Sequence, residues 1–196
     1  MSVVVHEVAH GYVALYLGDQ TAKRMGRLTL NPIKHLDPIG SVLIPAALIL
    51  SHAGFVLGWA RPVPYVEANL RDKKWGTLKV SIAGALSNFA IAIIFGILLR
   101  LFAFSNSVTP AIVFIASTII IVNIFLGIFN LIPIPPLDGS KVLFALLPHT
   151  QSSINFQRFF TKYSIFFLFF FIFFLWQFIL PVVYFIYFVL TGHSLS

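Results

Sequence analysis

The stretch VTPAIVFIASTIIIVNIFLGIFNL, residues 108–131, contains no charged side chain. A helix needs roughly 20 apolar residues to cross the hydrocarbon core of a bilayer, so this stretch is long enough to span a membrane. Residues 78–103 and 163–190 are also long enough, whereas 1–17 is short and 39–57 is marginal. The sequence therefore predicts an all-α polytopic membrane protein, a bundle of about four spanning helices with a fifth apolar segment.

The overall composition agrees with this prediction. Hydrophobic residues make up 59% and charged residues 10% of the 196 residues, and the mean hydropathy is +0.94. Soluble domains usually carry about 25% charged residues. The length suits one compact membrane-embedded domain over residues 1–196, which ends in the Phe-rich helix 163–190.

The charged residues and the absence of cysteine exclude several kinds of chemistry. The net charge is +7, but most basic residues lie in short segments between the apolar stretches. Membrane topology explains this distribution, and no nucleic-acid partner is expected. The sequence contains no cysteine, which excludes disulfides, thiolate metal ligands and a cysteine nucleophile.

The first apolar segment carries the motif HEVAH at residues 6–10. Residues four apart share one face of a helix, so His6 and His10 can direct two imidazoles at one point, with Glu7 beside them. Two histidines suit zinc, which takes three protein ligands in catalytic sites, and Glu7 could serve as general base. The alternative is hydrogen bonding within a bundle. Ionisable residues in an apolar span cost at least about 2.5–3.5 kcal/mol each and normally mark function, so we favour the metal site.

A third ligand is then required, and Asp138 is the best acidic candidate. It directly follows an apolar run in the sequence FNLIPIPPLDG, residues 129–139. The three prolines prevent a regular helix, and irregular backbone at membrane depth is tolerated where it lines a cavity. Gly139 permits a sharp turn beside Asp138. The spacing alone is equally compatible with Asp138 as an ordinary helix-capping residue.

Three motifs together carry a family resemblance. HEVAH at 6–10, GALSN at 84–88 and NLIPIPPLDG at 130–139 resemble, in identity and order, the motifs of the site-two protease family of intramembrane zinc metalloproteases. The resemblance covers about residues 1–150 and implies a catalytic core there. It looks like a minimal form, because no segment outside the apolar stretches is long enough for a PDZ or CBS domain.

The resemblance also implies roles for particular residues. Glu7 would be the catalytic base, and the zinc ligands would be His6, His10 and Asp138. Asn88 and Asn130 would lie near the site, where they would orient substrate or stabilise an oxyanion. Only five residues precede His6, fewer than is usual in that family, so we expect the natural chain to begin upstream of Met1.

The function best supported by these residues is proteolysis within or next to transmembrane segments of other membrane proteins, that is, regulated intramembrane proteolysis. The cofactor would be Zn²⁺, and the partners would be a transmembrane protein substrate and the lipid bilayer. One alternative is a membrane metallohydrolase that acts on a lipid-like or soluble peptide substrate, and another is a non-proteolytic zinc-binding or transport protein. Glu7 favours a protease, because storage and transport sites do not need a carboxylate beside the first ligand. The sequence does not name the substrate, the trigger or the oligomeric state.

The polar segment after the first helix suggests a strand. Residues 22–30 alternate weakly between polar and apolar side chains and precede the turn signal Asn31-Pro32. This pattern predicts a short β-strand or hairpin at the membrane surface. Such a strand could receive an unwound substrate by edge addition.

The path of 39–57 decides the topology. This segment either spans the membrane or, as its glycines and Pro45 allow, dips into the bilayer and returns. If it returns, the basic loops 18–38 and 58–77 share one side, and the uncharged loop 104–109 lies on the other. The positive-inside rule then puts the basic loops in the cytoplasm. We expect the return, in a prokaryotic plasma membrane, with the active site nearer the cytoplasmic face.

Overall fold

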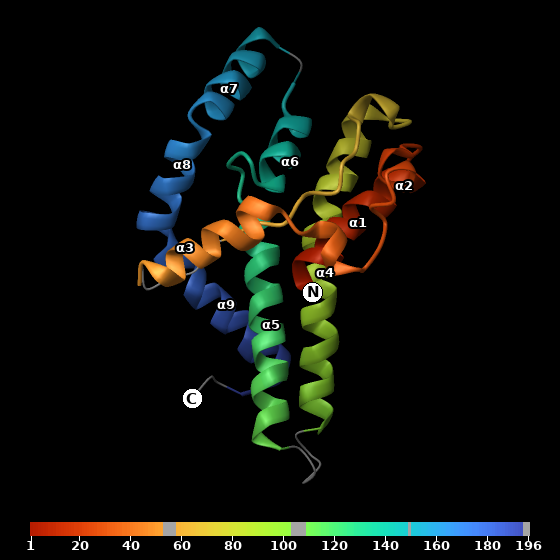
Figure 1. The fold of residues 1–196 in the computed structure, drawn as a ribbon. Helices are drawn as coiled ribbons and strands as arrows, with labels where there is room; N and C mark the ends of the chain where they lie inside the picture. The colour runs from red at the N-terminus through yellow and green to blue at the C-terminus, as the bar shows by residue number, and fades with distance from the viewer. Residues whose placement is uncertain (53–57, 103–108, 149, 194–196) are drawn as a thin grey trace.

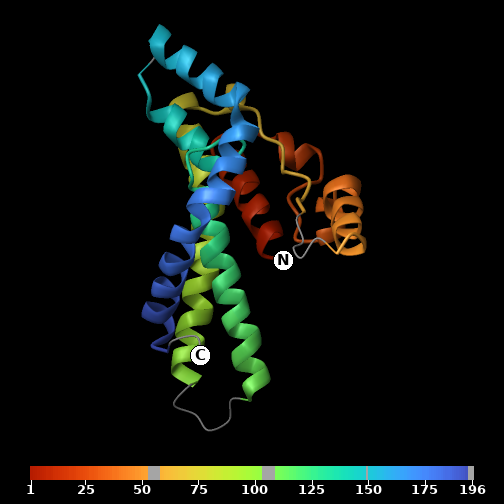
Figure 2. The ribbon, with the colours of Figure 1, turned by 90° about the vertical axis from the view of Figure 1, so that its left-hand side faces the viewer.

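The computed structural model describes residues 1–52, 58–102, 109–148 and 150–193. Two long antiparallel helices, α4 (Lys73–Phe102) and α5 (Pro110–Asn130), form the long axis of the molecule (Figure 1). α1 (Ser2–Tyr16) packs against α4 near one end of this axis. α9 (Trp176–Thr191) packs against α4 and α5 toward the other end (Figures 1 and 2).

Shorter helices complete the described chain. They are α2 (Thr21–Arg24), η1 (Pro32–His35), η2 (Pro38–Leu43), α3 (Ile44–Leu50), η3 (Glu67–Asn69), α6 (Asp138–Leu146), α7 (Gln151–Lys162), α8 (Ser164–Phe170) and η4 (Phe171–Leu175). The main apolar core lies between α4, α5 and the C-terminal helices and consists of Ala92, Leu99, Ile120, Ile124, Phe171, Ile179, Val183 and Tyr187. α4 is thus the central helix, because it also packs against α1 and α6.

The long apolar helices identify a membrane protein. Among the described residues, α4 and α5 are long and apolar enough to cross a bilayer. The helix pair Gln151–Lys162 and Ser164–Phe174, which is bent by 67°, adds a third candidate if it forms one span. α1 has only 15 residues, fewer than a span needs. Length and composition therefore support two or three spans among the described helices, and the predicted four are not confirmed.

The strand predicted near 22–30 is not formed, and no other strand occurs in the described ranges. Thr21–Arg24 form α2 instead, and Gly26 turns the chain with a φ of +63°. Arg27 is 9% exposed, and its guanidinium donates to carbonyl oxygens of two neighbouring segments, those of Lys34, Arg61 and Pro62. The Arg27 side chain therefore connects these segments in place of a β-ladder. The weak alternation of the sequence could not reveal these contacts.

The apolar segment from η2 to α3 runs transverse to the α4–α5 axis and lies to one side of it (Figures 1 and 2). Its two flanks meet again, because the Trp59 N–H donates to Gly40 O at 3.1 Å and Ser41 Oγ donates to Trp59 O at 2.7 Å. The chain thus leaves and returns at one place, as the returning path requires. Residues 53–57 of this segment, and residues 103–108 of the predicted outer loop, lie outside the described part of the chain.

The loops on either side of this segment are held together by Asp19. This residue is 1% exposed and accepts hydrogen bonds from Val66 N at 2.7 Å and Asn69 Nδ2 at 3.0 Å, as well as from Thr21. Burial alone would raise the pKa of the Asp19 carboxyl, but the hydrogen bonds from Thr21, Asn69 and Val66 outweigh it and lower this pKa. The loop after α1 and the loop before α4 therefore lie side by side.

Candidate functional site

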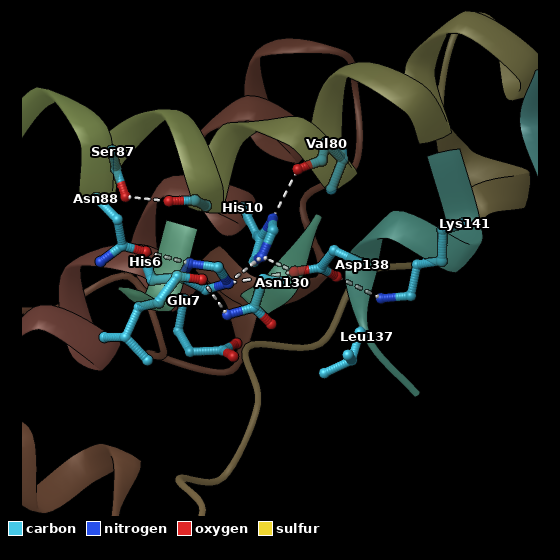
Figure 3. A network of polar contacts seen from close by, with 12 residues as sticks. His6, Glu7, His10, Val80, Ser87, Asn88, Asn130, Leu137, Asp138 and Lys141 are labelled. Atoms are coloured by element: carbon cyan, nitrogen blue, oxygen red, sulfur yellow. Dashed lines mark hydrogen bonds and ion pairs between the residues drawn. The ribbon is translucent and has the colours of Figure 1, made fainter. Parts of the chain in front are cut away.

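Two histidines and one aspartate converge between α1, α4 and α6 (Figure 3). His6 Nε2 lies 3.2 Å and His10 Nε2 lies 2.9 Å from Asp138 Oδ2. The two Nε2 atoms are 3.0 Å apart. All three residues are buried. The structure therefore brings together the three side chains that the sequence motifs predicted as ligands.

Local geometry and two glycines make this convergence possible. His6 and His10 are one turn apart on α1, so both rings leave the same face. Gly84 of α4 packs against these rings, and an added Cβ would lie 2.5 Å from the Nε2 atoms of both histidines. Gly139 packs against Leu131 O, where a side chain would collide with backbone, and this close approach holds Asp138 at the start of α6.

The outer nitrogen of each imidazole is hydrogen bonded to oxygen. His10 Nδ1 lies 2.6 Å from Val80 O, and His6 Nδ1 lies 2.6 Å from Asn88 Oδ1. A carbonyl oxygen can only accept a hydrogen bond, so His10 Nδ1 carries the proton and its Nε2 lone pair points inward. Asn88 presents its amide oxygen to His6 (Figure 3), so His6 Nδ1 also carries the proton and the lone pair of His6 Nε2 also points inward.

The donor set fits a zinc ion. Imidazole nitrogen and carboxylate oxygen are ordinary zinc ligands, and ligating histidines usually donate their other N–H to a carbonyl or carboxylate. The three ligand atoms lie within 4.8 Å of one another, and their lone pairs would repel one another without a cation between them. Lys141 Nζ binds the other carboxylate oxygen, Asp138 Oδ1, at 3.1 Å, which leaves Oδ2 for the metal.

Glu7 lies at the wall of a cavity of about 510 Å³, which His6 also lines, whereas His10 and Asp138 do not. Its Oε2 accepts a hydrogen bond from Val63 N–H at 2.8 Å. This open cavity lies between α1, the two flanks of the η2–α3 segment and the end of α5. It is lined by Val3, His6, Glu7, Gly40, Ser41, Pro45, Gly58, Trp59, Ala60, Leu126, Phe129 and Asn130. A bound peptide could therefore reach Glu7 and the ligand cluster from this space.

The two predicted asparagines occupy different positions. Asn130 lines the cavity and donates to Leu126 O at 3.0 Å. Asn88 is fully buried and contacts His6 on the side away from the ligand cluster. The structure therefore brings Asn130, but not Asn88, to the space where a substrate could bind.

Sequence reasoning missed several groups around the site. Val80 contributes a backbone oxygen, which no side-chain motif can reveal. Lys141 is three residues after Asp138, a spacing that places both on one helix face. Asn123 is fully buried and hydrogen bonded to Asn88. A polar side chain within the apolar run of residues 108–131 was a signal that could have identified it.

Comparison with known proteins yields one family. A profile of peptidase family M50 matches residues 102–175. The putative zinc metalloprotease YwhC of Bacillus subtilis is 43% identical over 153 residues, which cover 76% of this chain and 66% of the relative. The putative zinc metalloprotease Rip2 of Mycolicibacterium smegmatis is 32% identical over 162 residues, covering 79% of this chain and 58% of the relative.

A zinc metalloprotease of Methanocaldococcus jannaschii is 31% identical over 149 residues, covering 75% of this chain and 32% of the relative. No solved structure matches this chain. The chain spans about two thirds or less of the length of these three relatives. Their similarity extends over most of the chain, and the segment that the family profile matches includes Asp138. This chain therefore belongs to peptidase family M50, the site-two protease family.

Proposed function

We propose that this chain is a zinc-dependent endopeptidase that hydrolyses peptide bonds within or next to transmembrane segments of other membrane proteins. The observation that supports this most is the convergence of two imidazole nitrogens and one carboxylate oxygen beside a cavity that Glu7 also lines. The relatives named zinc metalloproteases support the same chemistry. The substrate would be a transmembrane protein, presented from the lipid bilayer.

In this proposal His6, His10 and Asp138 hold the zinc ion. When bound, zinc supplies a Lewis acid that lowers the pKa of water and polarises a peptide carbonyl. Val80 O and Asn88 Oδ1 orient the two imidazoles, and Lys141 orients the Asp138 carboxylate. These contacts are made before any substrate arrives, so the site is pre-organised.

Glu7 is the proposed general base. Its carboxylate would take a proton from the attacking water and pass it to the leaving amine. The Val63 N–H that Glu7 binds anchors this carboxylate at the cavity wall. Asn130 lines the same cavity, and its amide could donate to the substrate or to the developing oxyanion.

The cavity also suits an unwound peptide. A peptide bond inside a helix is shielded by the helix hydrogen bonds, so the substrate must be extended locally. Gly40 and Gly58 of the η2–α3 segment's two flanks line this cavity, and Leu126 and Phe129 of α5 add apolar side chains to the lining. An extended apolar segment could therefore lie between the returning segment and α5.

We further propose a multi-pass topology of a single domain. α1, α4, α5 and the helix from α8 to α9 would be four spans, and the segment from η2 to α3 would enter the bilayer and return. The hydrogen bonds between its flanks support this path, and the basic loops would face the cytoplasm of a prokaryotic cell. Single cysteines at Gln20 and Asn69 should react with impermeant reagent from the same side, and labelling from opposite sides would contradict the return.

The proposed function is tested by Glu7→Gln. We expect cleavage of a tagged transmembrane reporter to fall by at least about 100-fold, because general base catalysis contributes about 10²–10⁴-fold. Zinc content should stay at the level of the unchanged protein, since Glu7 holds no metal. Glu67→Gln, at an exposed position in η3, is the matched control and should cleave normally.

Two further variants test the ligands. His6→Ala and Asp138→Ala should each lower the zinc content measured by elemental analysis. Equal zinc in both variants and in the unchanged protein would contradict the metal site. Normal cleavage by Glu7→Gln would contradict the role of Glu7 as general base. An unchanged protein that holds zinc but cleaves no reporter would instead favour a zinc-binding or transport protein.

A further inference from the structure

A chain of buried amide groups connects α5 to the metal centre. Asn88 on α4 and Asn123 on α5 are both 0% exposed, although the helices around them are apolar. Burying an amide without partners costs about 1–3 kcal/mol in proteins. Both amides are hydrogen bonded, and donation runs in one direction, from His6 through Asn88 and Asn123 to the backbone of α5.

The orientation of the Asn123 amide is fixed by the backbone oxygen of Ile119, which can only accept a hydrogen bond. Asn123 Nδ2 donates to Ile119 O at 2.8 Å and to Ser2 Oγ at 2.9 Å. The NH₂ end of Asn123 must therefore face Ile119, and its oxygen must face Asn88. Asn88 Nδ2 donates to that oxygen, Asn123 Oδ1, at 2.9 Å.

The orientation of Asn88 then decides the state of His6. With its NH₂ group turned to Asn123, and also 3.5 Å from Ser2 O, Asn88 presents Oδ1 to His6 Nδ1 at 2.6 Å. An amide oxygen can only accept, so the proton of neutral His6 resides on Nδ1 and its lone pair on Nε2. If Asn88 were reversed, it would donate to Nδ1, and the proton on Nε2 would block metal binding.

The orientation of Asn88 matters because a second group, Asp138, competes for the proton of His6. Asp138 Oδ2 lies 3.2 Å from His6 Nε2 and would attract a proton to that nitrogen. His10 resists the same attraction through Val80 O, a backbone group that cannot be reversed. His6 has only a side-chain amide in the corresponding position, and an amide can rotate.

We propose that Asn123 is a positioning residue that fixes the His6 tautomer through Asn88. Asn123 holds the Asn88 amide with its oxygen toward His6, so that the Nε2 lone pair faces the metal. Asn88 accordingly serves His6 and not the substrate, since it does not line the cavity. This inference rests on the proposed metal role of His6.

The first test is Asn123→Leu, which keeps the approximate volume and removes the amide. Zinc affinity, measured by competition with a chelator, should fall by about tenfold or more, the effect typical of losing an outer-shell partner of a metal ligand. Ser117→Ala is the matched control, because it removes a buried hydrogen bond from the same helix, to Tyr187 OH at 2.7 Å. That variant should bind zinc with unchanged affinity.

The second test is rescue by Asn88→Asp. A carboxylate can only accept, so it orients the His6 Nδ1–H whichever way it is turned. The double variant Asn88→Asp with Asn123→Leu should therefore bind zinc more tightly than Asn123→Leu alone. If Asn123→Leu binds zinc as tightly as the unchanged protein, or if Asn88→Asp gives no recovery, the proposal is wrong.

A third measurement does not depend on zinc. The ¹⁵N chemical shifts of His6 in metal-free protein, assigned by their loss in His6→Asn, report which ring nitrogen carries the proton. Asn123→Leu should move the neutral ring toward the Nε2–H form, whereas Ser117→Ala should not. An unchanged tautomer ratio would overturn the proposal, whether or not the protein binds zinc. Failure of the unchanged protein to bind zinc would instead contradict the proposed function.

Discussion

The two halves of α4 differ in composition and in their neighbours. The half from Lys73 to Asn88 packs against α1 and α6, and its buried residues are small or polar: Gly76, Thr77, Val80, Ser81, Ala83, Gly84, Ala85 and Asn88. The half from Phe89 to Phe102 packs against α5 and α9, and it buries Ala92, Gly96 and Leu99. One helix thus packs against the proposed metal ligands with one half and contributes to an apolar core with the other.

The same residue type serves different purposes in the two halves. Gly84 leaves room for the two imidazoles, whereas Gly96 lets α9 approach closely at Leu190. The small residue therefore permits polar chemistry in one half and close helix packing in the other. Substitutions on the two halves should separate zinc binding from stability.

The clearest contrast in zinc binding between the two halves is expected between Gly84→Ala and Gly96→Ala. The Cβ at position 84 would lie 2.5 Å from the Nε2 atoms of both histidines, and the Cβ at position 96 would lie 2.9 Å from Leu190 Cβ. Overpacking of this kind costs about 1–3 kcal/mol. For Gly84→Ala this predicts about 5–150-fold weaker zinc binding and loss of cleavage.

Gly96→Ala should lower thermal stability by a similar free energy and leave zinc affinity unchanged. Chelator competition and thermal unfolding in the same detergent measure the two effects. If both variants lose zinc equally, the two halves are not independent and the comparison fails.

A second prediction concerns Ile120, which is 0% exposed in the apolar core. Ile120→Ala should lower the free energy of unfolding by about 2–5 kcal/mol, because it removes buried methyl groups and leaves a cavity. Zinc content per folded molecule should not change. Loss of zinc in the folded fraction would show that the core also determines the geometry of the metal centre.

A smaller, pH-dependent effect is expected at Asp19, beyond the polar end of α4. The pKa of Asp19 lies below its ordinary value of 3.8 in the folded protein, so its stabilising contribution is complete above that value. It is lost as the pH falls through the lowered pKa. Asp19→Asn should therefore be less stable than the unchanged protein at pH 7, by about 1.5–3 kcal/mol for a charge-assisted hydrogen bond.

The difference in melting temperature between the two proteins should stay constant from pH 7 to pH 5 and shrink below about pH 4. Comparing the two proteins at each pH cancels the contributions of the other titrating groups. A difference that is independent of pH down to pH 2 would mean that the Asp19 charge does not hold the two loops together.

Local sequence patterns determined much of this molecule. The spacing of His6 and His10 placed both on one face of α1 because a helix repeats every 3.6 residues. Uninterrupted apolar runs predicted α4 and α5, since helix length follows from bilayer thickness. Asp138 was selected because it follows an apolar run beside a glycine, and its role as a ligand stays a prediction.

Only the tertiary structure decided how distant segments meet. The weak alternation of 22–30 gave no β-ladder, because Arg27 bonds to carbonyl groups far away in sequence. The flanks of the η2–α3 segment meet through the hydrogen bond from Trp59 to Gly40, and Asn88 meets Asn123 across two helices. Helices in a membrane protein are apolar on nearly every face, so hydropathy cannot specify which faces pack together. That choice depends on small residues, buried amides and backbone oxygens whose partners become adjacent only after folding.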